Sequence, residues 1–282
     1  MKISELLSYG YKTLKETGID SYLLDTQLLL QKVLEVDKLF IIMNKELEID
    51  IEKQKEFFRI IELRKNKMPI KYITGHCEFM GLDFLVKEGI LIPRPDTELL
   101  VEEVIKLAKT SNCKRICDVC SGSGAIGISL AYFLGNIQVF CSDLSTVACE
   151  VTEENSKRLL GENKIKVFQS DLLKFAKGDN MKFDIIVSNP PYIRDEIIGT
   201  LMEDVRGYEP LMALSGGEDG LEFYRRITAE SLEILEESGI LAFEIGYDQA
   251  VDVRNIMEAN NYKNINIFQD LAGLDRVVIG NR

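Results

Sequence analysis

Apolar residues in the first 70 positions recur at the spacing of short amphipathic helices. One run begins at Ser4, and Asp20 with Ser21 can cap the next run. In that second run the apolar residues fall at positions 23, 24, 28, 30, 33 and 34. A third helix is predicted over residues 51–65, ending before Pro69. The pattern therefore predicts a small bundle of three helices.

The pattern changes over residues 72–92, where apolar and polar positions alternate between glycines. This alternation predicts a β-hairpin that links two parts of the chain. Pro93 and Pro95 then interrupt the backbone, and Asp96 with Thr97 can cap a helix over residues 97–109.

Beyond residue 110, runs typical of strands alternate with runs typical of helices. The predicted strands cover residues 115–119, 137–143, 164–171, 183–189, 239–246, 265–270 and 276–280. Such alternation requires right-handed crossovers, so the fold class is α/β, with a doubly wound, mostly parallel sheet covered by helices on both faces. The predicted organisation is a helical domain over 1–71, a hairpin linker over 72–92 and an α/β domain over 93–282.

Charge is distributed unevenly along the chain of 282 residues, whose net charge is -12. Residues 1–75 hold 13 basic and 12 acidic side chains, and the remainder holds 21 basic and 34 acidic ones. A protein that grips duplex nucleic acid by its phosphates needs a basic face, so this balance argues against that class. One basic cluster forms either a solvated face or a partner-docking surface, and consists of Arg59, Arg64, Lys65, Lys67 and Lys71.

Several kinds of site are excluded by residue type. The single histidine, His76, rules out a zinc site built on several histidines and is interpreted as a surface or linker residue. Cys117 and Cys120 form a lone CxxC, so we expect buried, unreactive thiols and no metal site. No run approaches the ~20 apolar residues of a membrane span, and the N-terminus lacks a signal-peptide pattern, so we expect a cytoplasmic protein.

The glycine-rich segment 118–127, DVCSGSGAIG, lies between a predicted strand and a predicted helix. Small residues there let a ligand approach the backbone, and the start of the helix offers free N–H groups. Asp143 ends the next strand and can accept hydrogen bonds from two ribose hydroxyls. The arrangement indicates an adenosine-containing cofactor, and by itself leaves a nicotinamide dinucleotide and S-adenosylmethionine open.

The second motif is Asn189-Pro190-Pro191-Tyr192, at the end of the fourth predicted strand. In a parallel sheet this strand end opens onto the same crevice as the glycine loop. The Asn189 side-chain carbonyl and the Pro190 backbone carbonyl can accept both hydrogens of a planar NH₂ group, beside a flat wall from Tyr192. The motif therefore indicates a site for an amide or exocyclic amine, and it favours S-adenosylmethionine over a nicotinamide cofactor.

Longer stretches of sequence narrow the choice among methyltransferase families. NPPY resembles the motif of amino-group methyltransferases, and the whole chain resembles the release factor glutamine N5-methyltransferase family. The matching stretches cover nearly the full length and are ITGHCEFMGLDFLV (73–86), ILIPRPDTELLVE (90–102), DVCSGSGAIGISLA (118–131), VSNPPYI (187–193), YEPLMALSGGEDGL (208–221), FEIG (243–246) and DLAGLDRVV (270–278).

The resemblance implies a seven-stranded Rossmann-like methyltransferase sheet and an N-terminal helical domain that docks the substrate. It implies methyl transfer from S-adenosylmethionine to the side-chain amide nitrogen (N5) of the glutamine in the GGQ motif of class 1 peptide chain release factors, which modulates translation termination. It places cofactor contacts at Cys120, Ser121, Gly122, Ser123, Gly124, Asp143, Asp171, Leu172 and Asn189. Catalytic residues would be Asn189, Pro190 and Tyr192, and substrate contacts would be Asn189, Pro190, Pro191, Tyr192 and Arg94.

Some features stay open at this level. Cys120 stands where the family usually has glycine, and because a side chain tolerates only negative φ comfortably, we expect an altered loop and at most weaker cofactor contact. Arg94 can orient a substrate carbonyl or the cofactor carboxylate, or can pair with Glu98. Glu244 can line the crevice or cap a helix. We further expect a monomer that works near the ribosome without binding nucleic acid directly.

Three other functions fit part of the pattern. An adenine-N6 DNA methyltransferase applies the same NPPY logic to a flipped base, but it needs a basic DNA-recognition region. An RNA guanine-N2 or ribosomal protein methyltransferase could use the basic cluster to touch RNA. A non-catalytic module that docks release factors or ribosomes belongs to a different class, and the intact NPPY motif argues against it.

Overall fold

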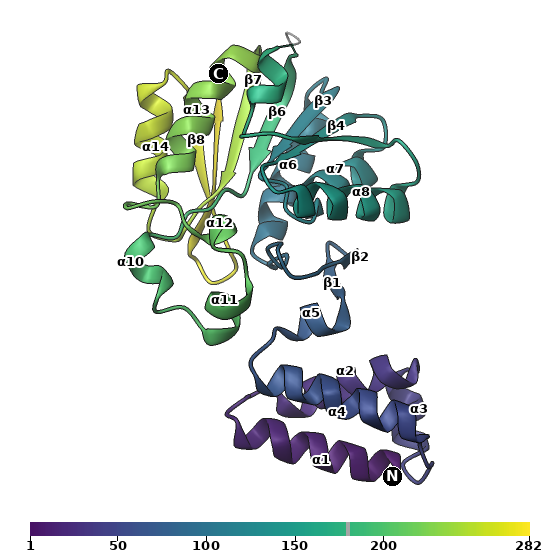
Figure 1. Cartoon of the computed structure of the whole chain (residues 1–282). Helices are drawn as coiled ribbons and strands as arrows, with labels where there is room; N and C mark the ends of the chain where they lie inside the picture. The colour runs from purple at the N-terminus through teal and green to yellow at the C-terminus, as the bar shows by residue number, and fades with distance from the viewer. Residues whose placement is uncertain (179–180) are drawn as a thin grey trace. The chain divides into compact units, whose positions relative to one another are not determined.

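The computed structural model describes residues 1–178 and 181–282, and these form two compact units (Figure 1). The first unit comprises Met1–His76 with Met202–Tyr208, and the second comprises Cys77–Leu201 with Glu209–Arg282. Within the described residues, no helix has both the length and the apolar character needed to cross a membrane.

The first unit is a helical bundle. Its helices are α1 (Ile3–Glu16), α2 (Tyr22–Leu34), α3 (Lys38–Met43), α4 (Ile51–Lys65), α5 (Ile70–Thr74) and α11 (Glu203–Tyr208). The prediction of three helices in the first 70 residues missed α3 and α5, which are too short to show a helical period. Ser21 is the N-cap of α2 but makes no side-chain capping hydrogen bond, so the predicted cap is wrong. A side-chain cap is present at α4, where Asp50 Oδ1 accepts two backbone N–H groups.

Four residues of the basic cluster have polar partners inside this unit. Arg64 is buried, and its Nε donates to Asp25 Oδ2 at 2.7 Å. Arg59 and Lys65 each pair with a glutamate one turn earlier in α4. The ammonium of Lys67 donates to a backbone carbonyl. Arg59 stays exposed and Lys65 stays partly exposed in these pairs, so the choice between a solvated face and a docking surface stays a prediction.

The predicted hairpin is present and shorter than residues 72–92. Its strands are β1 (His76–Phe79) and β2 (Leu82–Leu85). Met80 and Gly81 join them with φ of 52° and 72°. Two successive positive φ values give the turn whose twist matches that of a hairpin.

The second unit is built on one seven-stranded sheet. Its strands are β3 (Arg115–Val119), β4 (Gln138–Asp143), β5 (Ile165–Gln169), β6 (Phe183–Ser188), β7 (Leu235–Glu244), β8 (Lys263–Gln269) and β9 (Asp275–Asn281). The spatial order is β5-β4-β3-β6-β7-β9-β8; β9 pairs antiparallel with β7 and β8, and the other neighbouring strands pair parallel. The predicted doubly wound, mostly parallel sheet is confirmed. Its order reverses between β3 and β6, where such sheets place their ligands.

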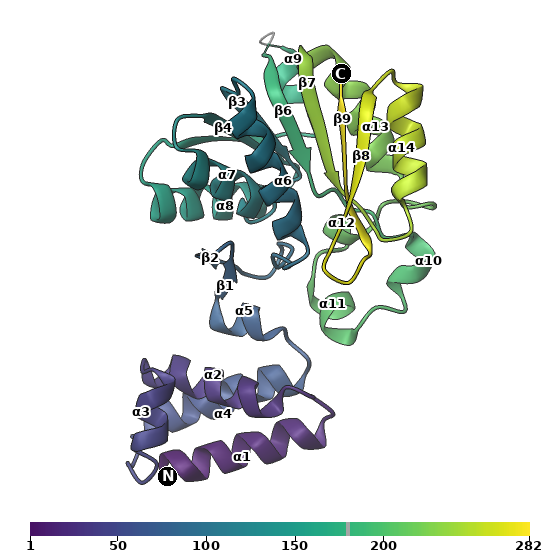
Figure 2. The same cartoon turned by 180° about the vertical axis from the view of Figure 1, so that it is seen from behind.

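Helices cover both faces of the sheet, as Figures 1 and 2 show from opposite sides. One face carries α13 (Glu222–Ile234) and α14 (Ala250–Ala259), and the other carries α6 (Thr97–Thr110), α7 (Ala125–Leu134) and α8 (Thr146–Leu160). The shorter helices are α9 (Lys174–Lys177), α10 (Asp195–Ile198) and α12 (Leu211–Leu214).

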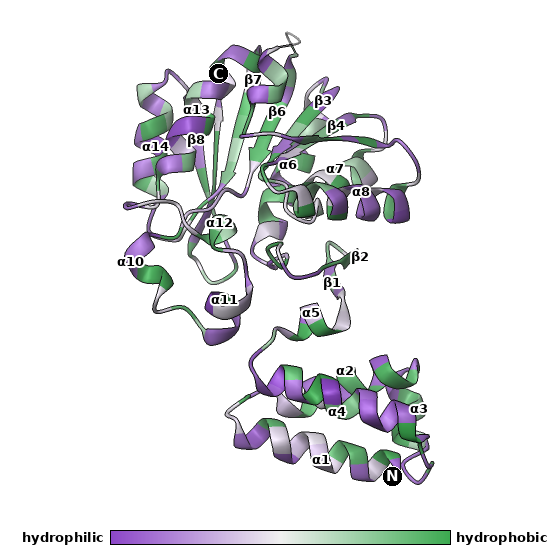
Figure 3. Cartoon of the chain, in the orientation of Figure 1, coloured by the Kyte–Doolittle hydropathy of each residue, from purple (hydrophilic) through white to green (hydrophobic). Residues whose placement is uncertain are grey.

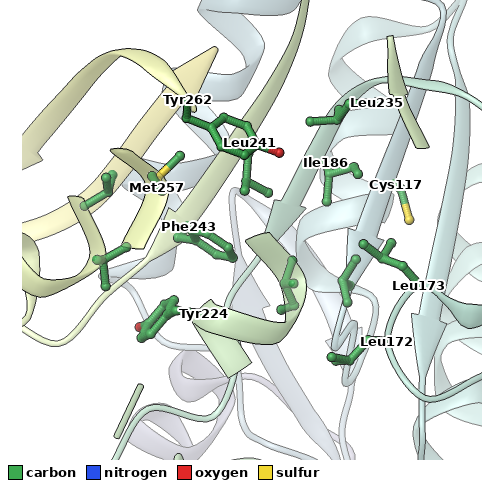
Figure 4. Close-up of a cluster of buried hydrophobic side chains, with 14 of the residues drawn as sticks. Cys117, Leu172, Leu173, Ile186, Tyr224, Leu235, Leu241, Phe243, Met257 and Tyr262 are labelled. Carbon is green, nitrogen blue, oxygen red and sulfur yellow. The ribbon is translucent and has the colours of Figure 1, made fainter. Parts of the chain in front are cut away.

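Alternate residues of the central strands enter different cores because both faces are covered. Cys117, Ile186 and Phe243 belong to one buried cluster that also contains residues of α13 and α14 (Figure 4). Their neighbours Ile116 and Ile185 pack on the opposite face. A strand buried on both faces is a continuous apolar run, which is why the central strands are hydrophobic along their length (Figure 3).

Candidate active site

A cavity of about 570 Å³ lies at the carboxyl ends of β3, β4 and β6, and its size is typical of a cofactor pocket. Strand register explains its position. Val119 pairs with Ser188 on one side and with Ser142 on the other. The loops that follow these three strands therefore emerge side by side. They bring together Cys120, Asp143 and Asn189, which all line the cavity.

The loop after β3 keeps a glycine-like conformation although it begins with cysteine. Cys120 has φ 61° and Gly122 has φ 57°. The expectation that a side chain at position 120 requires negative φ is therefore wrong, and the effect on cofactor contact stays a prediction. Neighbouring hydrogen bonds hold the backbone there: Ser121 N–H donates to Ser142 O at 3.1 Å, and Gly124 N–H donates to Ser121 O at 2.7 Å. They must offset a cost of about 1–2 kcal/mol for a non-glycine residue in the left-handed region.

Both carboxylate oxygens of Asp143 are oriented by the backbone. Oδ2 accepts the Gly122 N–H and Oδ1 accepts the Ser145 N–H, each at 2.9 Å. Burial raises the pKa of this carboxyl, and the backbone N–H groups act in the opposite direction. Each oxygen keeps a second lone pair, so the group can still accept hydrogens from a ligand in the cavity.

The other predicted cofactor contacts divide into two sets. Ser121, Ser123, Asp171 and Leu172 line the cavity, whereas Gly124 lies behind the loop as the N-cap of α7. Ser121 Oγ is buried and has no hydrogen-bond partner within the described part of the chain. A hydrogen bond from the Lys174 ammonium and an ion pair with Arg226 hold Asp171, and they lower its pKa.

The NPPY motif places two of its residues on the cavity wall, Asn189 and Pro191. Asn189 Nδ2 donates to Thr97 Oγ1 at 3.2 Å, so Oδ1 remains as the acceptor of this amide. Pro190 and Tyr192 are not part of the wall. Tyr192 Oη instead donates to Glu244 Oε1 at 3.4 Å, which ties its ring to β7.

Sequence reasoning missed the role of Thr97. We expected Asp96 and Thr97 to cap α6, and Asp96 is its N-cap but makes no side-chain capping hydrogen bond. Thr97 is buried and lines the cavity beside Asn189. The PRPDTE stretch indicates that Thr97 belongs to the family motif. Nothing in it indicates that the partner of Thr97 is Asn189, 92 residues away.

Arg94 lines the cavity but does not pair with Glu98, so that interpretation is wrong. Its Nη2 lies 2.7 Å from both oxygens of Glu209, whose side chain is 1% exposed. Glu98 Oε1 accepts the Met80 N–H at 2.7 Å and so holds the hairpin. The separation of 115 residues hides the Arg94–Glu209 pair from any local pattern.

Glu244 is a buried carboxyl behind the motif. It is 2% exposed and does not line the cavity, and Gln249 rather than Glu244 is the N-cap of α14. Both earlier interpretations, a crevice wall and a helix cap, are therefore wrong. Burial raises its pKa from 4.5 to about 7, and a hydrogen bond with the Thr97 hydroxyl acts in the opposite direction.

This pKa predicts how stability depends on pH. Between 4.5 and about 7 the folded protein keeps the Glu244 proton that the unfolded chain releases. The free energy of unfolding therefore falls as pH rises through this window, by up to roughly 3 kcal/mol from this group. Glu244→Gln cannot ionise, so we expect it to lose that part of the slope. Urea unfolding at pH 5 and pH 8 measures this change, with the exposed Glu237→Gln variant as control. An equal change in the free energy of unfolding between the two pH values in Glu244→Gln and wild type would refute it.

Comparisons with known proteins agree with this architecture. Residues 5–75 match the PrmC N-terminal domain, and residues 95–203 match the methyltransferase small domain. The chain is 50% identical to the release factor glutamine methyltransferase of Clostridium botulinum over 278 residues, covering 99% of this chain and 98% of that protein. It is 50% identical to that of Clostridium acetobutylicum over 282 residues, covering 100% and 99%. A solved ribosomal protein L11 methylase from Lactobacillus delbrueckii subsp. bulgaricus shares the fold, with TM-score 0.50 and 22% identity over 70% of this chain and 83% of that one.

The sheet order, the matched domain and the cavity at the switch point together define the class: this chain is an enzyme, a methyltransferase. Its relatives match it from end to end at 50% identity. The chain belongs to the release factor glutamine methyltransferase family, and the resemblance seen in the sequence is confirmed.

Proposed function

We propose that this enzyme transfers a methyl group from S-adenosylmethionine to N5 of the glutamine in the GGQ motif of class 1 peptide chain release factors, and so modulates translation termination. One observation carries the proposal: the Asn189 amide, oriented by Thr97, stands on the wall of the cavity that also holds the glycine loop and Asp143. The names of the curated relatives support the choice of substrate.

The residues of the cavity fit S-adenosylmethionine. We assign the ribose hydroxyls to the Asp143 carboxylate and an apolar contact with adenine to Leu172. The unpartnered Ser121 Oγ offers a further polar contact. Beside Gly122, an added Cβ would meet no protein atom within 4 Å, so the backbone there is open to a ligand. When bound, the cofactor supplies a methyl group on a positively charged sulfur.

The protein's own part in the reaction is positioning. An amide nitrogen is a poor nucleophile because its lone pair is delocalised into the carbonyl. Asn189 Oδ1 and the Pro190 carbonyl would hold both N–H groups of the glutamine amide and aim its lone pair at the methyl group. These acceptors interact more strongly as positive charge builds on the nitrogen. Alignment of two bound reactants can lower the barrier by up to ~7–11 kcal/mol.

No strong base is needed before the attack. The proton can leave late, to water or to a carbonyl. Pro191, which lines the cavity, would flank the amide plane. Arg94 also lines the cavity and is held by Glu209, and it offers its remaining N–H groups to a substrate carbonyl.

The proposal extends to the whole chain. The helical domain over residues 1–71 would dock the release factor, the hairpin over 72–92 would link it, and residues 93–282 would carry the catalysis. Since release factors act at the ribosome, the enzyme would work as a cytoplasmic monomer near ribosomes, without contacting nucleic acid itself.

A Cys120→Gly variant tests the unusual start of the cofactor loop. Glycine adopts the φ of 61° found at this position, so we expect its Kd for S-adenosylmethionine to stay within about threefold of wild type. Isothermal titration calorimetry measures this, with Cys113→Ser as the control. A change beyond about tenfold would instead assign the thiol a direct role in binding.

A competition between acceptors tests the proposed substrate. The protein and methyl-labelled S-adenosylmethionine are incubated in one mixture with a purified class 1 release factor, duplex DNA and ribosomal RNA. The label in each acceptor is then measured separately. We expect label in the release factor alone. Label in DNA or RNA alone would overturn the proposal in favour of a nucleic-acid methyltransferase, and cofactor binding without turnover would favour a binding module.

A further inference from the structure

The YEP…GGEDG stretch begins with Glu209, which holds Arg94, and its end lies against the backbone that follows NPPY. Ile193 N–H donates to Leu214 O at 3.0 Å, and Gly216 N–H donates to Ile193 O at 2.8 Å. These bonds form a short parallel bridge between Ile193 and Ser215. Residues 214–220 therefore form a support for the chain as it leaves the motif.

Gln249 joins this support to the motif through its side-chain amide. Nε2 donates to Tyr192 O at 3.0 Å and to Gly220 O at 3.2 Å. Oε1 accepts the Gly246 N–H at 3.0 Å. The side chain is buried, with 2% of the residue exposed, and does not line the cavity. Gln249 thus connects three chain segments without reaching a ligand.

A side chain at position 220 would not fit between Tyr192 and Gln249. Gly220 has φ 73°, and a Cβ at this position would lie 2.5 Å from Tyr192 O and 2.8 Å from Gln249 Nε2. The glycine lets the two carbonyls approach the amide closely enough for both to accept from it. The geometry is therefore specific to glycine at 220 and to a donor at 249.

Backbone chemistry makes this contact important for the motif. Pro190 and Pro191 have no N–H, so neither can fix its place by donating to a neighbour. Tyr192 O is the first carbonyl after the prolines and lies two peptide units from the Pro190 carbonyl. Between the two carbonyls the φ of Pro191 is fixed by its ring, so the position of Tyr192 O restricts that of the Pro190 carbonyl. A shift of Tyr192 would move that acceptor.

We propose that Gln249 is a positioning residue of the methyl-transfer site, holding the Pro190 carbonyl in place through Tyr192 and Gly220. This inference rests on the proposed function of the NPPY motif. The amide acts through the backbone and touches neither cofactor nor substrate. Misplacement of a reacting group by about 1 Å can cost up to ~10²-fold in rate, so a remote anchor can matter.

Gln249→Met and Gln249→Glu both remove the Nε2 donor. Methionine keeps the volume of the side chain, and glutamate keeps its shape. We expect both to lower kcat for release-factor methylation by about 10- to 100-fold, with KM for release factor and Kd for S-adenosylmethionine within about threefold of wild type. Gly220→Ala should lower kcat similarly, and the double variant with Gln249→Met should lose little more than either single variant. Exposed Gln138→Met is the matched control.

Hydrogen–deuterium exchange of the same proteins gives a readout that needs no substrate. We expect the peptide containing residues 192–195 to exchange faster in Gln249→Met, while the peptide containing Asp143 is unchanged. Unchanged kcat and unchanged exchange in a folded variant would overturn the inference, and so would equal losses of kcat, cofactor affinity and melting temperature. If wild type fails to methylate the release factor, the proposed function falls, and the exchange of residues 192–195 alone decides the role of Gln249.

Discussion

An Asn189→Ala variant is expected to lose kcat by about 10²–10³-fold, the range found when one preorganised polar group at a reacting centre is removed. Asn189 Oδ1 is the side-chain acceptor that we assign to the glutamine N–H, and Thr97 holds its amide in plane. Alanine removes that acceptor and leaves the Pro190 carbonyl alone. Kd for S-adenosylmethionine should stay within about threefold of wild type, because Asp143 and the glycine loop remain.

Single-turnover kinetics and calorimetry on the same preparation separate the two quantities. Exposed Asn136→Ala is the matched control and should behave as wild type. A variant that loses cofactor binding and turnover in equal measure would contradict this division of roles, since Asn189 would then serve mainly the cofactor.

The second large effect is expected for Asp143→Asn. This exchange keeps the shape but replaces one acceptor oxygen with a donor, so a ribose hydroxyl or the Gly122 N–H loses its partner. Hydrogen bonds to a charged group contribute about 1.5–3 kcal/mol, so Kd for S-adenosylmethionine should rise about 10²-fold. At saturating cofactor, kcat should change little.

Asp184→Asn provides a close control for Asp143→Asn. Asp184 Oδ2 also accepts two backbone N–H groups, each at 2.8 Å, but at the opposite end of the sheet. We expect it to lose stability without losing cofactor affinity. Equal effects of the two variants on Kd would show that Asp143 acts by supporting its loop rather than by binding the ribose.

The sheet was predictable because its central strands are buried on both faces. β3 and β6 are short, mainly apolar runs, and the structure places them where the sequence predicted. The site followed from the same logic. Strand ends that carry Asp143 and Asn189 meet at the switch point of any such sheet.

What the sequence could not show were contacts between distant polar groups. Thr97 with Asn189, Arg94 with Glu209 and Gln249 with Tyr192 are separated by 92, 115 and 57 residues. Each pair depends on the packing of several elements, and no local period records it. The family resemblance marked stretches that contain all of these residues except Gln249, but it did not show which of them pair.

Local conformational rules also failed in particular places. Cys120 adopts positive φ against its own preference, because the hydrogen bonds of the surrounding loop determine the backbone there. Ser21 and Asp96 occupy cap positions without capping. In these places tertiary structure outweighs an intrinsic preference worth about 1–2 kcal/mol.

The central claim is methylation of one particular glutamine, and peptide mass spectrometry of a release factor after reaction tests it most directly. Wild-type protein with S-adenosylmethionine should add the mass of one methyl group, and fragmentation should place it on the side chain of the GGQ glutamine. The Asn189→Ala variant, run beside it, should leave that peptide almost unmodified. A methyl group found on another residue, or a release factor left unmodified by wild type, would contradict the account.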